Sequence, residues 1–226
     1  MKKILLMAGV AAFAFASNAN ALEVNPYVSA KLSYDWAKND VITTEKFNGF
    51  KETEKSKLHK NLWGGHYAAG VKANAIRAEI EWNHWNDAKR TYFDDEEGGK
   101  ERIRLQNHVL MFNGYYDFNT CTRWTPYVGA GVGVAMLKLT GNYMDADGHD
   151  KVSNKSYNVA WQIGAGVAYD LTKNIALDAG YRYINAGAAT LDKYNESYPG
   201  YGYAESIKTK VDTAAHEIYF GARYTF

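Results

Sequence analysis

The sequence predicts an all-β protein, an eight-stranded antiparallel transmembrane β-barrel with up-and-down meander order. Three observations predict it. Apolar and polar residues alternate in eight segments of about ten residues, as strands with one face toward lipid require. The connections between these segments are alternately long and short, and the chain ends on an aromatic residue. No run of roughly 18 apolar residues follows Ala21, which excludes a bundle of transmembrane helices.

The first 21 residues are expected to be a secretory signal peptide. Lys2 and Lys3 precede a mostly apolar run over 4–16, and the small-residue pattern of 19–21 gives a cleavage site. An N-terminal membrane anchor is the alternative, but the run is shorter than the roughly 20 residues that a spanning helix needs. Removing 21 of the 226 residues leaves 205, and residues 22–226 are predicted to form one barrel domain.

Composition supports a membrane barrel and excludes other classes. The chain has 18 Tyr, 6 Trp and 20 Gly but only 3 Pro. Its formal charge of +1 becomes −1 when the two lysines of the signal segment are removed, so nucleic acid is not an expected partner. The single cysteine, Cys121, cannot form an internal disulfide.

The first four strands are expected over 27–36, 67–73 and 76–83 and in a segment whose last part is 110–118. In 27–36 the even-numbered residues from Val28 are apolar or aromatic and the odd-numbered ones are polar to Asp35. Residues 67–73 alternate less sharply. In 76–83 the apolar even positions interleave with three charges, and charges on one face of a strand require a lumen and not lipid.

The last four strands are expected over 128–136, 161–169, 175–183 and 217–226. The first of these places apolar residues at even positions and glycine or alanine between them. The next two place their apolar and aromatic residues at odd positions. In the last, even positions from Ile218 to Phe226 are apolar or aromatic.

The connections orient the barrel. Long polar stretches at 37–62, 88–101, 140–155 and 186–212 are predicted to be extracellular loops, and short turns near 74, 119–125 and 171–174 to be periplasmic. Both termini are then periplasmic and the barrel lies in the cell outer membrane. A soluble antiparallel barrel is the alternative. It is disfavoured because aromatic residues gather at the predicted strand ends, as in the interfacial girdles of membrane barrels.

Charged residues of both signs occupy the face opposite to lipid. An eight-stranded barrel has an interior only wide enough to be filled by side chains, so these charges must pair or meet water. A salt-bridged plug is expected, and a narrow ion path, as in a small porin, is the alternative. The predicted network consists of Lys31, Lys72, Arg77, Glu79, Glu81, Asp178, Arg182, Glu217 and Arg223, with Asp35 and Asp117 on the same face.

The last eight residues carry a predicted assembly signal. Phe226 ends the chain, Tyr224 lies two residues earlier and Gly221 five earlier. A terminal edge strand with projecting aromatic residues can pair with the open edge of another barrel. The expected reader of this signal is the barrel-assembly machinery of the outer membrane.

Several segments resemble the porin-opacity family of small outer-membrane barrels. The resemblance rests on the runs 115–118, 125–133 and 177–183 and on the closing strand. It implies a non-enzymatic surface protein, because members include host-cell adhesins and surface antigens. The expected role is envelope structure, adhesion or host contact. The expected partners are outer-membrane lipids, lipopolysaccharide, and host surface molecules that meet loops 37–62, 88–101, 140–155 and 186–212.

An outer-membrane lipid-modifying enzyme is a further alternative. Such an enzyme needs a nucleophile or an acid–base set at the outer rim. His84 is expected near that rim, but the sequence indicates no serine partner for it. The six histidines lack metal-ligand spacing, and the acidic segment 145–150 does not fit a calcium loop. No catalytic residue, cofactor or metal is therefore expected.

Overall fold

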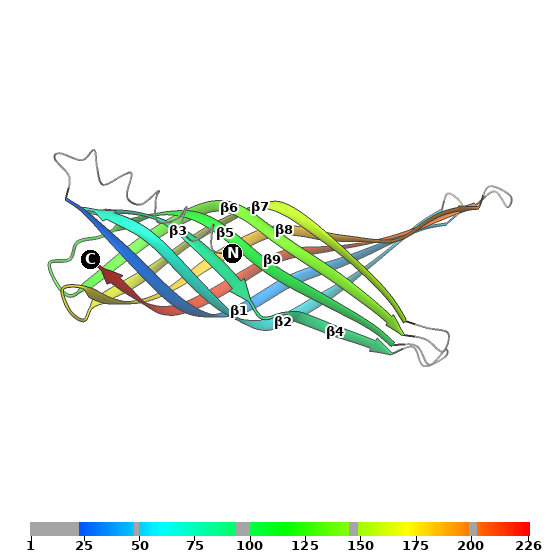
Figure 1. Ribbon diagram of the computed structural model, residues 1–226, viewed down its shortest axis with the longest axis horizontal. Coiled ribbons are helices and arrows are strands. Elements are labelled where there is room, and N and C mark those ends of the chain that lie inside the picture. The colour runs from blue at the N-terminus through cyan, green and yellow to red at the C-terminus, as the bar shows by residue number, and fades with distance from the viewer. Residues whose placement is uncertain (1–22, 48–49, 94–99, 145–148, 199–202) are drawn as a thin grey trace.

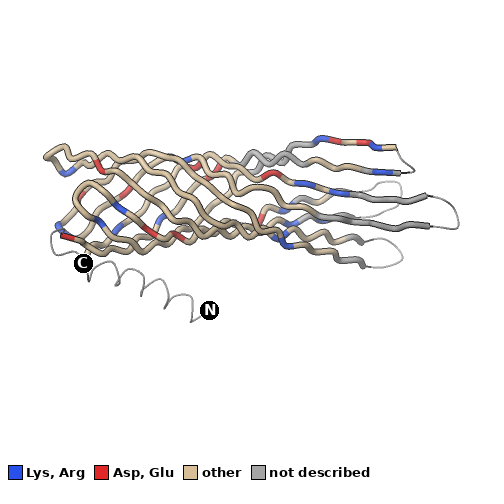
Figure 2. Tube along the Cα trace, turned by 90° about the horizontal axis from the view of Figure 1, so that it is seen from above, with Lys and Arg blue, Asp and Glu red and all other residues tan. Residues whose placement is uncertain are grey.

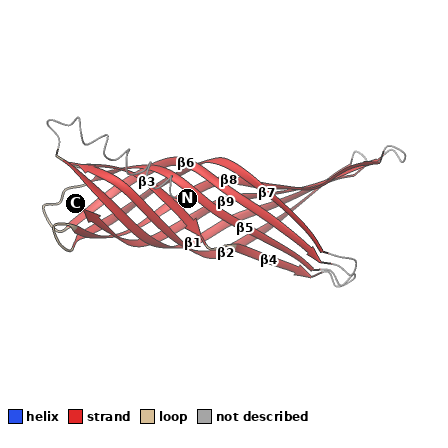
Figure 3. Ribbon diagram, in the orientation of Figure 1, coloured by secondary structure: helices blue, strands red, loops and turns tan. Residues whose placement is uncertain are grey.

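The computed structural model describes residues 23–47, 50–93, 100–144, 149–198 and 203–226. The signal peptide predicted for 1–21 lies outside these residues. Within them the regular structure is all strand (Figures 1 and 3), and no helix is long and apolar enough to span a bilayer. The strands are β1 (Val24–Phe47), β2 (Phe50–Ala73), β3 (Ile76–Trp85), β4 (Ala88–Phe93), β5 (Lys100–Asp117), β6 (Trp124–Met144), β7 (His149–Asp170), β8 (Ile175–Tyr198) and β9 (Tyr203–Thr225).

The strands close into the predicted eight-stranded antiparallel barrel. β1 pairs with β9, where Val28 lies opposite Tyr224, and this pairing joins the two ends of the meander. β3 and β4 both pair with β5 and are separated only by Asn86 and Asp87. β3 and β4 are therefore two parts of one barrel strand, so the nine segments form a barrel of eight strands. Closure leaves no strand edge in the membrane-spanning part of the wall.

The pairing register fixes how the strands tilt. A path that starts at Tyr27 and follows paired residues around the barrel returns to β1 at Ala37, ten residues further along. This stagger tilts the strands and leaves an interior that side chains can fill. Glycine provides the remaining room, because a Cβ atom at Gly166 would lie 2.6 Å from the Tyr127 ring.

The outer surface of the barrel carries an apolar belt. Leu32, Val132, Ile163 and Phe220 are all exposed on it, from four different strands. Aromatic residues border the belt at both ends. Those near the end with the long connections are Trp36, Trp63, Trp82 and Trp161, and those near the end with the short turns are Tyr116, Phe118, Trp124, Tyr224 and Phe226.

The prediction of four long loops is wrong for the described residues, because the strands continue through these segments. β1 and β2 stay paired until Phe47 meets Phe50, and β8 and β9 stay paired until Tyr198 meets Tyr203. The segments 37–62, 88–101, 140–155 and 186–212 are mainly long hairpins. Apolar residues stop alternating where the strands leave the lipid. The backbone hydrogen bonds between strands do not require that alternation, so the strands continue.

Beyond the belt the barrel divides into two four-stranded sheets. β2 and β3 pair only up to Gly64 and Trp85, and β7 and β8 only up to Trp161 and Asn185. Past these residues, β8, β9, β1 and β2 form one sheet, called here the long arm (residues 37–47, 50–62, 186–198 and 203–215). β4, β5, β6 and β7 form the other, the short arm (residues 88–93, 100–107, 137–144 and 149–159). The two arms diverge at the right of Figure 1.

An apolar core lies between the bases of the two arms. On β6 the outward Met136 is followed by buried Leu137 and Leu139, with Lys138 pointing outward between them. The apolar residues thus change from the outer to the inner face where the strand leaves lipid for water. The buried cluster consists of Trp85, Ala88, Leu105, Val109, Met111, Ala135, Leu137, Leu139, Ala160, Ile184, Ala186, Ala189 and Val211.

Candidate functional site

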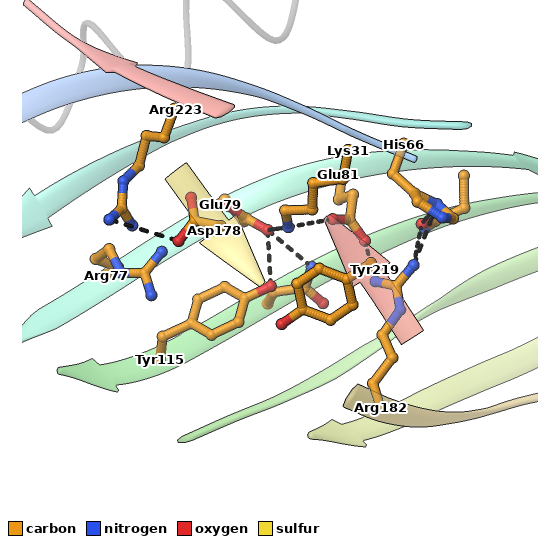
Figure 4. A network of polar contacts seen from close by, with 12 residues as sticks. Lys31, His66, Arg77, Glu79, Glu81, Tyr115, Asp178, Arg182, Tyr219 and Arg223 are labelled. Carbon is orange, nitrogen blue, oxygen red and sulfur yellow. Dashed lines mark hydrogen bonds and ion pairs between the residues drawn. The ribbon is translucent and has the colours of Figure 1, made fainter. Parts of the chain in front are cut away.

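The upper layer of the lumen network centres on two carboxylates. Glu81 on β3 lies 2.6 Å from Lys31 Nζ and 2.5 Å from Arg182 Nη1. Glu217 on β9 lies 2.6 Å from Arg182 Nε and 3.4 Å from His66 Nε2. Side chains from five strands, β1, β2, β3, β8 and β9, therefore meet in one connected set of polar contacts, which Figure 4 shows from close by.

Glu79 is the centre of the next layer. It accepts hydrogen bonds from the hydroxyls of Tyr27 and Tyr115, both at 2.8 Å. Lys31 Nζ and Asn113 Nδ2 are each 3.2 Å from the same carboxylate. Four donors from two other strands, β1 and β5, thus surround one buried carboxylate, and a buried charge that is paired and hydrogen-bonded in this way can remain ionised.

The layer nearest the short turns contains the remaining charges. Arg77 donates to Asp117 at 2.9 Å, and Lys72 lies 2.9 Å from the same carboxylate. The Arg77 guanidinium lies between the rings of Tyr115 and Tyr127, at 4.6 and 4.7 Å from their centroids. These ring contacts hold the guanidinium in the plane where it meets Asp117.

The nine charged residues predicted for the network all lie on the inner face of the wall. Eight are buried, and Lys72 is 34% exposed at the short-turn mouth. Arg223 lies 3.6 Å from Asp178. Uncharged partners were missed by considering charge alone, although the same alternation places them inward. They are Tyr27, His66, Asn83, Asn113, Tyr115, Tyr127, Gln162 and Tyr219.

The interior is filled by the three ionic layers and, above them, by the apolar core. Above the ionic layers, the cavity next to Asp35, Trp85 and Ile184 has a volume of about 30 Å³, room for a water molecule. The apolar core begins directly above it. At the short-turn mouth the hollow is wider, about 840 Å³, and ends at Arg223 and Ala176. Among the described residues, side chains thus occupy the interior between the two cavities.

His84 lies on the outer rim, as expected, but faces outward. Its ring stacks on that of His108 at a centroid distance of 4.7 Å, and their Nδ1 atoms are 3.3 Å apart. Trp82 stacks on both rings. The nearby Asp87 carboxylate accepts hydrogen bonds from Arg104 and forms an ion pair with it. The arrangement is an aromatic stack, and in the part of the chain that the structure describes no hydroxyl or thiol is hydrogen-bonded to His84.

The residues of the predicted assembly signal lie on the closing strand. Tyr224 and Phe226 project outward and contact each other edge to face at 5.2 Å. Gly221 faces inward, where a Cβ atom would overlap the backbone of β1. Phe226 N donates to Pro26 O at 3.0 Å, so the described N-terminal end and the last residue lie at the same mouth. Their recognition by the assembly machinery stays a prediction.

These features define an outer-membrane β-barrel whose interior holds buried charged and apolar side chains and whose strands continue beyond the apolar belt. The chain belongs to the outer membrane protein beta-barrel domain family, whose sequence model matches residues 4–226. The resemblance to opacity-type barrels is also confirmed. Opacity protein V28 of Neisseria gonorrhoeae is 24% identical over 248 residues, covering 89% of this chain and 97% of that protein.

Other relatives match part of their length. Outer membrane protein PagN of Salmonella typhimurium is 37% identical over 131 residues, which cover 56% of this chain and 52% of PagN. The chain thus spans about half of that relative. The crystal structure of OprG from Pseudomonas aeruginosa shares the fold, with a TM-score of 0.55, 16% identity, and coverage of 91% of this chain and 97% of that one.

Proposed function

We propose that the protein is a non-enzymatic surface protein that presents two β-sheet arms outside the cell for adhesion or host contact. The observation that carries the proposal is the continuation of the strands beyond the apolar belt. An extended, paired hairpin holds its end at a fixed distance and direction from the membrane, which suits a contact surface. The short-turn mouth and both ends of the chain then face the periplasm.

The end of the long arm has the chemistry of a contact site. Phe50, the first residue of β2, is 81% exposed there. Lys46 and Lys51 lie opposite each other in the adjacent pair and are both exposed. Aromatic side chains are enriched at protein–protein contacts, which makes Phe50 a candidate contact residue.

The closed lumen supports this role over that of a small porin. An ionic layer and an apolar core fill successive levels of the interior, and each alone would obstruct ions. The outward-facing stack of His84 and His108 likewise supports a non-enzymatic role over lipid modification, because no activated nucleophile contacts either ring among the described residues.

The test is to shorten one arm at a time in cells that display the protein. Deleting 44–53 and 192–208, each replaced by Asn-Gly, shortens the long arm but keeps Val211 and the core. The matched control deletes 142–151 and shortens the short arm. Heat-modifiable migration verifies folding of each variant. Loss of adherence to epithelial cells with the first deletion is expected, and adherence equal to that of the full-length protein would refute the proposal.

A further inference from the structure

The two faces of each arm differ in charge. On the short arm, Arg102, Arg104, Lys138 and Lys155 share the outward face, whereas Leu105, Leu137 and Leu139 lie on the opposite face, in the core. On the long arm, five lysines share the outward face: Lys46, Lys51, Lys55, Lys208 and Lys210. Glu52 and Glu54 lie on its opposite face. Lysines and arginines recur along both arms in Figure 2.

One pair of these lysines stands next to the membrane. Lys138 on β6 and Lys155 on β7 are direct cross-strand neighbours. The preceding outward residues toward the membrane are Met136, 41% exposed, and Tyr157, 64% exposed, so the two lysines occupy the first outward position beyond the apolar belt. This is the level at which lipid headgroups surround an outer-membrane barrel.

The two ammonium groups have no counterion among the described residues. Like charges directly opposite each other on a sheet destabilise it. Arg104, on the adjacent strand, forms an ion pair with Asp87. Among the residues that the structure describes, by contrast, no carboxylate lies within ion-pair distance of Lys138 or Lys155. A bound anion between the two ammonium groups would turn the repulsion into attraction.

We propose that Lys138 and Lys155 form a binding site for the phosphate groups of lipopolysaccharide in the outer leaflet. The site rests on the proposed orientation, with the arms outside. A lysine ammonium binds phosphate as a compact point charge, and two of them can flank one group. Gln106, opposite Lys138 on β5, and Ser153, two residues from Lys155, add neutral hydrogen-bond donors on the same face.

The long arm offers a matched control. Lys46 and Lys51 are also direct cross-strand neighbours, and both are exposed. They lie at the far end of the arm, away from the bilayer. A surface that attracts any soluble polyanion would use both pairs, whereas a site for a membrane-anchored phosphate uses only Lys138 and Lys155.

The experiment compares the wild type, K138Q/K155Q and K46Q/K51Q, refolded in detergent micelles. The heat-modifiability midpoint is measured without lipopolysaccharide, with lipopolysaccharide, and with the same material after enzymatic dephosphorylation. Without it, K138Q/K155Q should equal or exceed the wild type, because the repulsion is removed. With lipopolysaccharide, the midpoint of the wild type and of K46Q/K51Q should rise by about 5 °C. The midpoint of K138Q/K155Q should not rise. The dephosphorylated material should give no rise.

Three results would overturn the site. A full rise in K138Q/K155Q would place binding elsewhere, and equal loss in both double variants would indicate a general attraction of polyanions. An undiminished rise with dephosphorylated material would show that sugars or acyl chains, and not phosphates, are recognised. No host cell takes part in this measurement, so its failure is separate from failure of the proposed adhesive function.

Discussion

The guanidinium of Arg182 on β8 lies 2.5 Å from the carboxylate of Glu81 on β3, joining strands that are not neighbours in the sheet. Lys31 binds the same carboxylate from β1. Glu81 is fully buried, so its charge has no access to bulk water and depends on these two cations. The contact acts as a cross-brace inside the barrel.

Replacing Glu81 with glutamine should therefore strongly destabilise the barrel. The substitution removes the carboxylate that Lys31 and Arg182 share. Breaking a buried ion pair lowers the free energy of unfolding by about 3–5 kcal/mol. The unfolding midpoint in urea, followed by heat-modifiable migration, measures the effect. Glu54→Gln, on the exposed arm, is the control and should change the midpoint little. Equal midpoints for wild type and Glu81→Gln would show that the brace contributes nothing.

The refolded protein should give no steady current steps in a planar bilayer. Because the ionic and apolar layers fill different levels, removing the Glu81–Arg182 pair with E81A/R182A should still leave the bilayer silent. Reproducible steps from the wild type would contradict the closed lumen. Steps from E81A/R182A alone would mean that the apolar core above it does not seal.

The membrane part of the fold was predictable because every second residue of a strand faces lipid and must be apolar. That rule located the eight barrel strands, the inward charges and the aromatic borders. The partners within the network were not predictable, because Glu81 meets Lys31 and Arg182 only through the ten-residue stagger of the closed barrel. A stagger of different size would bring other inward residues to the same level.

The arms were missed because the same rule was applied where it no longer holds. Where strands lie in water, their outward positions need not be apolar. The arm segments therefore lack the apolar alternation and resemble polar loops in the sequence. One signal was available in the sequence: on β6 the apolar residues shift from even positions, ending at Met136, to odd positions at Leu137 and Leu139. A change of face without a break in alternation indicates a strand that leaves the bilayer.

The core between the arms should stabilise the extension without being needed for the membrane barrel. Leu137 is fully buried there, and Leu137→Ala removes packing worth about 2–5 kcal/mol. Protein in vesicles should then become sensitive to added protease in the arms, while the membrane part stays protected. Val132→Ala, on the lipid face of the same strand, is the control. Arms as resistant as those of the wild type would show that the core does not hold them.

The closing aromatic pair gives a prediction that separates assembly from stability. Tyr224 and Phe226 project from the terminal strand and are exposed, so Phe226→Ala removes little buried surface. If Phe226 belongs to a signal that the assembly machinery reads, Phe226→Ala should lower the amount of folded barrel in cells several-fold. Its refolding yield in detergent, where no machinery is present, should match the wild type. Phe220→Ala, exposed on the same strand within the lipid belt, should leave the cellular amount near normal. Equal losses for Phe220→Ala and Phe226→Ala in cells would mean that the strand needs apolar residues in general. Reduced refolding of Phe226→Ala in detergent would instead assign its role to the stability of the barrel.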